Sequence, residues 1–156
     1  MGKILKLSSL LRELRVLRKK KKKIVFTNGC FDILHQGHIY LLKKAKSFGD
    51  VLVVGLNSDS SVRRIKGESR PIKDEVSRAK ILSSIRFVDY VVIFKEDTPF
   101  RLIKVIKPDV LVKGGDWKLK DIVGREILKT YGGKIKRIKY LKGFSTTQLI
   151  KKCQKY

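Results

Sequence analysis

Short runs of aliphatic and β-branched residues alternate with longer segments of helical periodicity along most of the chain. Five of these runs are bounded by Gly, Asp, Asn or Pro, which is typical of buried strands. They cover residues 24–26, 51–56, 90–94, 110–112 and 135–138. Helical segments are expected at about 36–48, 74–86, 98–107 and 121–131, with a last one starting near residue 145. The alternation predicts an α/β fold, in which a Rossmann-like five-stranded parallel sheet carries helices on both faces.

The first 23 residues follow a different pattern. Apolar side chains recur there at every third or fourth position, at Ile4, Leu7, Leu11, Leu14 and Leu17 or Val16. This spacing predicts an amphipathic helix that lies on the domain. We therefore expect an N-terminal helix and basic segment at residues 1–23 and an α/β domain at residues 24–156. Charged residues interrupt the apolar stretch, and no run reaches the roughly 20 apolar residues of a membrane span. A cytoplasmic protein without a membrane partner is the expectation.

The chain carries a large excess of positive charge. It has 156 residues, with 38 Lys and Arg against 14 Asp and Glu, for a formal net charge of +24. Such a basic domain favours partners that bear phosphate, either nucleic acid or small molecules. The longest basic run, Arg18–Lys23, is short, and we interpret it as a solvated helix end. We expect no nucleic-acid partner, although a non-enzymatic nucleic-acid-binding module stays open as an alternative.

The densest group of candidate functional residues follows the first strand, in the stretch TNGCFDILHQGH at residues 27–38. Gly29 stands at the strand end, where the chain turns and a phosphate can approach the backbone. His35 and His38 follow near a helix start, so both imidazoles can donate to phosphate oxygens that gain charge during substitution. Gly37 leaves space between them. The spacing predicts a phosphoryl or nucleotidyl site.

Three other interpretations of this stretch are open. The histidines can be ordinary packing or surface residues. With Asp32 they can bind a metal, but a further well-spaced ligand is lacking. Cys30 can be a nucleophile, but nothing nearby completes an oxyanion arrangement. Cys30 and Cys153 form no CxxC pair, which favours a reducing compartment, and neither GxxxxGK[ST] nor GxGxxG occurs.

Four motifs carry a resemblance to a known family. GCFDILHQGH resembles the HxGH signature of the nucleotidyltransferase superfamily, which is related to class I aminoacyl-tRNA synthetases. NSDSSVRRIKGESRPI, EDTPFRLIKVIKPDVLVKGGDW and GFSTTQLIKK are similar, in the same order, to motifs of the adenylyltransferase domains of the ADP-heptose synthase family. The resemblance extends over essentially the whole chain and implies the nucleotidyltransferase fold.

The resemblance implies roles for several groups of residues. His35 and His38 would be catalytic and would stabilise charge on the α-phosphate and on the leaving pyrophosphate. Lys66, expected in a loop after the second strand, would reach over the phosphates as a mobile cation. Arg63 or Arg70 would bind the sugar phosphate. The implied nucleotide-binding residues are Thr27, Asn28, Gly29, Phe31, Gly37, Gly115, Asp116, Ser145, Thr146 and Thr147.

The implied reaction transfers AMP from ATP to D-glycero-β-D-manno-heptose 1-phosphate, which releases pyrophosphate and gives ADP-heptose for lipopolysaccharide core synthesis. Mg²⁺ would enter mainly through the triphosphate, without metal ligands from the protein. Trp117 departs from the pattern, because tryptophan here is typical of glycerol-3-phosphate cytidylyltransferases. A cytidylyltransferase acting on glycerol 3-phosphate is therefore the alternative. Relatives often carry a sugar-kinase domain, for which 156 residues leave no room, so a separate sugar kinase is expected. A homodimer is expected because relatives tend to dimerise.

Overall fold

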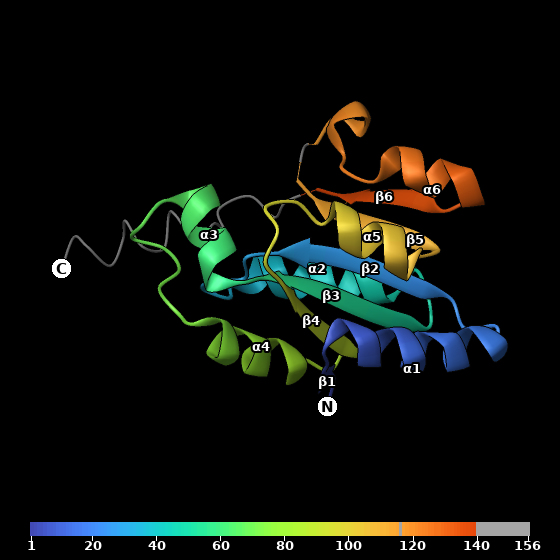
Figure 1. Ribbon diagram of the computed structural model, residues 1–156, viewed down its shortest axis with the longest axis horizontal. Coiled ribbons are helices and arrows are strands. Elements are labelled where there is room, and N and C mark those ends of the chain that lie inside the picture. The colour runs from blue at the N-terminus through green and yellow to red at the C-terminus, as the bar shows by residue number, and fades with distance from the viewer. Residues whose placement is uncertain (116, 140–156) are drawn as a thin grey trace.

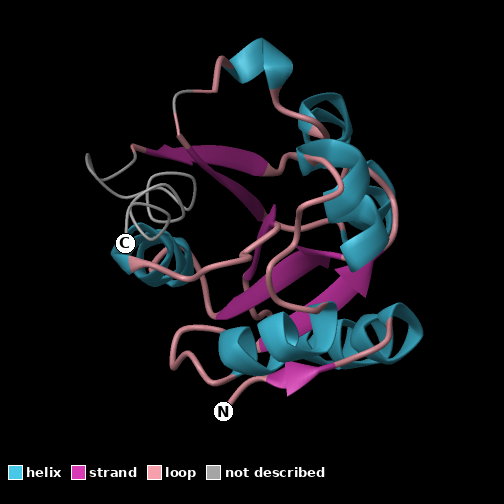
Figure 2. Ribbon diagram, turned by 90° about the vertical axis from the view of Figure 1, so that its left-hand side faces the viewer, coloured by secondary structure: helices cyan, strands magenta, loops and turns pink. Residues whose placement is uncertain are grey.

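A parallel β-sheet runs through the molecule, with helices on both of its faces (Figures 1 and 2). The computed structural model describes residues 1–115 and 117–139. The strands are β1 (Lys3–Ile4), β2 (Ile24–Gly29), β3 (Val51–Asn57), β4 (Tyr90–Phe94), β5 (Val110–Gly114) and β6 (Lys134–Ile138). They lie in the order β1-β4-β3-β2-β5-β6, and all pairs are parallel. The predicted fold class and its five strands are confirmed, and β1 is a sixth strand that was not predicted.

The helices cover the two faces of the sheet in separate groups. They are α1 (Leu7–Lys19), α2 (Gln36–Lys46), α3 (Asp59–Lys66), α4 (Glu75–Ser83), α5 (Phe100–Ile106) and α6 (Arg125–Tyr131), with a short 3-10 helix, η1 (Leu119–Asp121). One core cluster joins Phe26 and Leu111 of the sheet to α1, α5 and α6. The other joins Val25 and Val54 to α2 and α4. The alternation of side chains along each strand produces the two cores, because successive residues point to opposite faces.

The N-terminal segment is part of the same packing. Ile4 belongs to β1, which pairs with β4, so its predicted place on the amphipathic helix is wrong. Helix α1 lies on the sheet through Leu10 and Leu14, which are both fully buried. The division of the chain at residue 23 stays a prediction.

Aspartates that immediately precede three strands stabilise the amino edge of the sheet. Asp50 accepts a hydrogen bond from the backbone N–H of Lys23 (2.8 Å), and Asp109 accepts one from that of Ile24 (2.7 Å). Asp89 accepts one from the N–H of Leu52 (2.7 Å). These N–H groups stand at or next to strand starts, so the carboxylates satisfy donors that would otherwise lack a partner. The pKa of Asp50 is lowered chiefly by the hydrogen bond from Lys23.

The helix predicted over residues 121–131 is divided. Gly124 has a φ of +90°, and α6 begins only after it. A Cβ on Gly124 would lie 2.7 Å from Cδ1 of Ile103, so both the backbone conformation and the close approach to α5 favour glycine. The segment before it forms η1 instead of a first helical turn.

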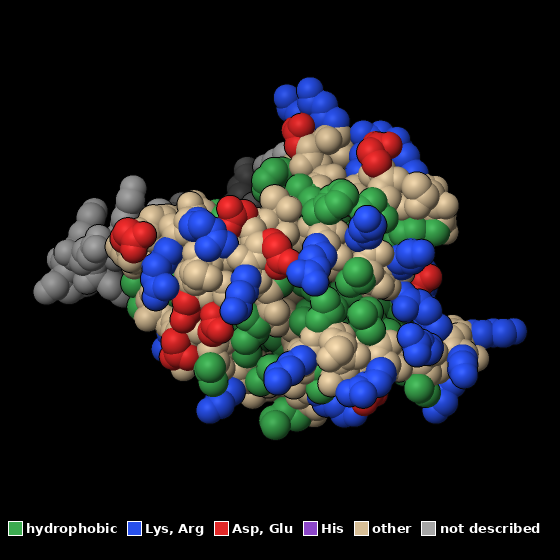
Figure 3. Space-filling view, in the orientation of Figure 1, with side chains coloured by type: hydrophobic (Ala, Val, Ile, Leu, Met, Phe, Trp, Pro, Cys, Tyr) green, Lys and Arg blue, Asp and Glu red, His purple; other side chains and the backbone are tan. Residues whose placement is uncertain are grey.

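Basic side chains are dispersed over the face of the molecule that Figure 3 shows. Figure 3 shows Lys and Arg spread over one whole face, interrupted by hydrophobic and acidic side chains. The run Arg18–Lys23 is exposed, in agreement with its interpretation as a solvated helix end. Within residues 1–115 and 117–139, no helix combines the length and apolarity needed to cross a bilayer.

We expect Leu14→Ala to lower the free energy of unfolding by about 2–5 kcal/mol, because it leaves a cavity between α1 and the sheet. Val16→Ala is the matched control, since Val16 lies on the same helix with 54% of its surface exposed, and its effect should stay within about 0.5 kcal/mol. Urea denaturation measures both. If residues 1–23 were an appendage that unfolds separately, Leu14→Ala would leave the main transition unchanged.

Candidate functional site

The connectivity of the sheet creates a topological switch point at the carboxyl ends of β2 and β5, the place where open α/β sheets form a ligand-binding crevice. From β2 the chain continues to β3 and β4 on one side, whereas β5 and β6 lie on the other side. Loops that leave the two neighbouring strands therefore run in opposite directions, and open α/β sheets bind ligands at such a switch point. The carboxyl ends face the side of the molecule where α3 lies, on the left of Figure 1. The histidine-containing stretch leaves β2 at this point.

The two histidines lie against each other at the start of α2. His35 is the N-cap residue of α2 in an extended conformation, and His38 is in its first turn. Their rings stack with centroids 3.8 Å apart, and the ring of Phe31 lies 5.2 Å from that of His38. A Cβ on Gly29 would come within 3.0 Å of the Phe31 ring, so this glycine gives the aromatic side chain its place. The structure thus brings the two predicted histidines together at the start of α2.

Three buried polar atoms of the crevice have no hydrogen-bond partner among the residues that the structure describes. They are Nδ1 of His35, Nδ1 of His38 and Oγ1 of Thr27. Buried polar atoms are normally paired, and an unpaired group costs free energy. Three such atoms at the mouth of a switch point are typical of a site whose partners arrive with a ligand.

Burial holds both imidazoles in the neutral form at neutral pH. Desolvation, together with the nearby His35, lowers the pKa of His38 to about 4, and desolvation lowers that of His35. A neutral imidazole retains one N–H that can donate to a phosphate oxygen. A bound anion would raise both pKa values, because it favours the protonated ring.

A buried arginine connects the loops around the crevice by hydrogen bonds. Arg78 of α4 has only 1% of its surface exposed. Its guanidinium donates to the carbonyls of Cys30 (2.5 Å) and Lys73 (2.9 Å) and to Oδ1 of Asp59 (2.7 Å). The residue thereby joins the β2–α2 loop, the segment before α4 and the start of α3. Sequence reasoning missed Arg78, because an arginine on a helix gives no local sign of burial.

Asp32 makes a second connection between the same loops. Its Oδ2 accepts from Nε of Arg70 (2.6 Å), and its Oδ1 accepts from the backbone N–H groups of Ile72 (2.8 Å) and Lys73 (3.0 Å). Burial alone would raise the pKa of Asp32, but these donors outweigh it and the pKa is lowered. Both carboxylate oxygens are therefore engaged in structure. Within residues 1–115 and 117–139, no group of three His, Cys, Asp or Glu side chains is arranged to bind a metal.

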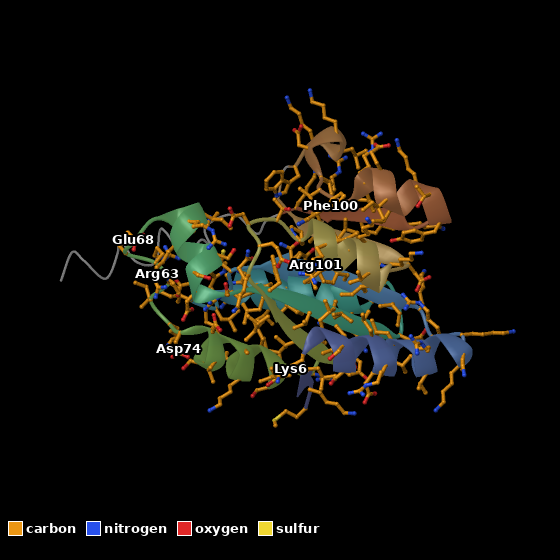
Figure 4. The ribbon with its side chains drawn as sticks, viewed as in Figure 1. Lys6, Arg63, Glu68, Asp74, Phe100 and Arg101 are labelled. Carbon is orange, nitrogen blue, oxygen red and sulfur yellow. The ribbon has the colours of Figure 1, made fainter. Side chains whose placement is uncertain are left out.

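Lys66 and Arg63 lie on a helix and not in the expected loop. Ser58 caps α3 by accepting from the backbone N–H of Ser61 (3.2 Å), and the helix continues to Lys66, where Gly67 ends it with a φ of +98°. The capping serine was the available signal for this helix. Arg63 and Lys66 are exposed, and Figure 4 shows Arg63 on α3. The positive charge of Lys66 lowers the pKa of the Cys30 thiol, an effect that burial outweighs.

Cys30 is poorly suited to act as a nucleophile. Burial raises the pKa of its thiol, and the opposing charges of Lys66, Arg78 and Arg70 do not offset this effect. A thiol in this state is largely protonated at neutral pH. This observation disfavours the covalent alternative.

The second strand of the crevice contributes Lys113, a residue to which sequence reasoning gave no role. Its amine donates to Oδ1 of Asn28. Beyond it, Gly115 has a φ of +99° and donates its N–H to the carbonyl of Ile138 (2.9 Å). Trp117 has 51% of its surface exposed, so it is not a core residue. The predicted ligand contacts at Asp116 and at Ser145, Thr146 and Thr147 lie outside the described residues.

This combination of an open parallel sheet and a histidine-lined switch point defines a nucleotide-binding α/β protein. The chain matches the cytidylyltransferase-like family over residues 26–152, and it belongs to that family. It is 55% identical over 151 residues to the bifunctional protein HldE of Geobacter metallireducens and 59% identical over 133 residues to that of Aliarcobacter butzleri. The matches cover 97% and 85% of this chain but 31% and 27% of the relatives. The chain thus spans about a third of the length of these curated relatives.

Two solved structures share the architecture. The lipopolysaccharide core biosynthesis protein from Thermoplasma volcanium superposes with a TM-score of 0.62 at 32% identity, over 79% of this chain and 99% of that one. Pantoate-β-alanine ligase from Francisella tularensis superposes with a TM-score of 0.61, over 96% of this chain and 76% of that one. Because its identity is 19%, this second likeness concerns the fold alone. The predicted membership of the nucleotidyltransferase superfamily is confirmed.

The depressed pKa of His38 predicts a dependence of stability on pH. Its ordinary pKa is 6.5 and its folded-state pKa is about 4, so between these values the unfolded chain binds more protons than the folded chain. Stability should therefore fall as the pH is lowered through this window. His38→Asn should lose less stability than the wild type between pH 7.5 and pH ~4.5 in urea denaturation. Parallel profiles of the two proteins would contradict the neutral, desolvated state of His38.

Proposed function

We propose that this chain is an adenylyltransferase that transfers AMP from ATP to a sugar 1-phosphate, D-glycero-β-D-manno-heptose 1-phosphate, with release of pyrophosphate. The observation that carries the proposal is the set of unpaired buried atoms of Thr27, His35 and His38 at the switch point. The four motifs, the HldE relatives and the likeness to a protein of lipopolysaccharide core biosynthesis support the choice of substrate class.

The reaction is an in-line displacement at the α-phosphorus of ATP. An oxygen of the sugar phosphate attacks, the bond to the pyrophosphate oxygen breaks, and the electron pair leaves with pyrophosphate. The attacking phosphate is already ionised, so the protein needs no general base. His35 and His38 donate to oxygens that gain charge, and Lys66 closes over the phosphates from the end of α3. A divalent cation enters with the triphosphate as part of the substrate, and we propose that it is Mg²⁺.

The acceptor phosphate binds beside the Asp32 cross-link in this proposal. Arg70 is held there through Nε, and among the described residues no group accepts from its two terminal nitrogens. These nitrogens are suited to a phosphate, because a guanidinium can present two parallel donors to its oxygens. Arg63, exposed on α3, is the second candidate for this role. Gly29 and Gly37 line the nucleotide phosphates, and Gly115 with Asp116 receives the nucleoside.

A cytidylyltransferase acting on glycerol 3-phosphate is the second candidate function. The exposed indole of Trp117 favours it, since this residue stands where such enzymes carry tryptophan and is free of core packing. The carbonyl of Trp117 accepts from Nη1 of Arg137 (3.0 Å), which ties the segment to β6. The separate sugar kinase, the homodimer and the cytoplasmic location stay predictions.

Pyrophosphate release separates the two functions. ATP and CTP are each supplied with Mg²⁺ and with either the heptose 1-phosphate or glycerol 3-phosphate, and release is measured in the four mixtures. We expect release with ATP and the heptose 1-phosphate. Release with CTP and glycerol 3-phosphate would move the activity to the second candidate, and silence in all four mixtures would contradict both.

His35→Ala and His38→Ala should each lower the turnover number by roughly 10²-fold or more, because each removes a donor to the charge that develops during transfer. Gln36→Ala is the matched control, since Gln36 is exposed and lies between them at the start of α2. Circular dichroism checks that the three variants keep their secondary structure. Near-normal turnover of both histidine variants would refute their catalytic assignment.

A further inference from the structure

Lys113 lies near the carboxyl end of β5, beside the carboxyl end of β2. Phe26 and Leu111 are neighbours in the register of these strands, and Asn28 and Lys113 each follow by two residues. Side chains two positions apart on a strand point to the same face, so Asn28 and Lys113 are also neighbours. The hydrogen bond from the lysine amine to Oδ1 of Asn28 is made in this position. The amine thus lies at the carboxyl ends of β2 and β5, on the sheet face of Phe26 and Leu111. The β2–α2 loop, which carries the histidines, leaves the sheet at the same end of β2.

The charge of Lys113 lacks an opposite charge in the described part of the chain. No carboxylate of residues 1–115 and 117–139 lies within ion-pair distance of its amine. The group that accepts from it, the Asn28 side chain, is a neutral amide. Desolvation by burial lowers the pKa of Lys113 to about 8, so the amine still carries its charge for most of the time at pH 7. Holding an unpaired cation in such a place opposes folding, because burial disfavours the charged form.

We propose that Lys113 is a substrate-binding residue whose amine, oriented by Asn28, pairs with a phosphoryl group of the bound substrates. The inference rests on the proposed function for the identity of the substrates. Its chemistry requires only a phosphate oxygen in the crevice. An ammonium group that meets this anion only in the complex contributes binding free energy there, whereas in the free protein it lowers stability. The phosphoryl group belongs either to the nucleotide or to the sugar 1-phosphate, and the experiment distinguishes these sources.

Lys113→Met is the informative substitution, because methionine keeps most of the apolar stem and removes the charge. Lys134→Met is the matched control, since Lys134 is exposed at the start of the neighbouring β6. Thermal unfolding is measured without ligand, with ATP and Mg²⁺, and with the heptose 1-phosphate. Without ligand, Lys113→Met should unfold at a temperature at least about 2 °C above that of the wild type. The rise in unfolding temperature that one of the two ligands gives the wild type should be lost.

The ligand whose stabilising effect disappears identifies the phosphoryl group that Lys113 binds. In the pyrophosphate assay, kcat/KM of Lys113→Met should fall by about 10²-fold or more, while Lys134→Met stays at the wild-type level. A lower unfolding temperature of Lys113→Met with unchanged ligand effects would overturn the inference and make the lysine structural. The inference is also overturned if neither phosphate ligand stabilises the wild type. Failure of the proposed function is recognised by a different result, because the wild type would then release no pyrophosphate.

A measurement on the wild type avoids reliance on a variant. The ¹³Cε resonance of Lys113 is followed against pH by NMR, without ligand and with ATP and Mg²⁺ or the heptose 1-phosphate. Pairing with a phosphoryl group should raise the pKa of Lys113 above its ligand-free value of about 8 in the presence of one of the ligands. An unchanged pKa with both ligands would overturn the inference.

Discussion

One buried guanidinium holds the loops of the candidate site in place. Arg78 bonds to three separate segments, the β2–α2 loop, the start of α3 and the turn before α4. A buried charge with unpaired donors is costly, so the folded state requires these three acceptors to converge on Arg78. Asp32 connects two of the same segments a second time through Arg70 and two backbone amides. The crevice is therefore organised before any ligand enters.

The two edges of the sheet differ in how their buried polar groups are paired. At the amino edge, Asp50, Asp89 and Asp109 satisfy backbone donors at the strand starts. At the carboxyl edge, the imidazoles of His35 and His38 have buried nitrogens without partners among the described residues. The carboxyl edge therefore combines the Arg78 and Asp32 networks with buried nitrogens that lack a partner among the described residues, whereas these donors of the amino edge are satisfied by carboxylates. This division is usual in enzymes, which tolerate local cost where the chemistry requires it.

The elements that sequence reasoning found and missed follow from how local their signals are. Buried strands such as β3 are continuous apolar runs, and they were found. Strand β1 has two exposed residues and exists only because β4 offers an open edge, so no pattern of its own could reveal it. Helix α3 has a polar, basic face that resembles a solvated loop, and only its Ser58 cap signals a start.

The residues of the candidate site were likewise found where their signals are local and missed where their partners are distant in sequence. His35 and His38 are three residues apart, so one motif reveals them. The partners of Asp32 at Ile72 and Lys73 lie 40 and 41 residues away, and the contact of Arg78 with Cys30 spans 48 residues. Lys113 reaches Asn28 across 85 residues. Such pairs depend on strand order and register, which the hydrophobic pattern leaves open.

The type of acceptor that Arg78 binds also affects how the loop sequences of this family can diversify. Two of the three acceptors are the backbone carbonyls of Cys30 and Lys73, and every amino acid supplies a carbonyl. Side chains in both loops can therefore change while the arginine keeps its bonds. A lineage that keeps Asp32, Asp59 and Arg70 can therefore alter the other loop side chains and with them the substrate, because the remaining bonds of Arg78 run to the backbone.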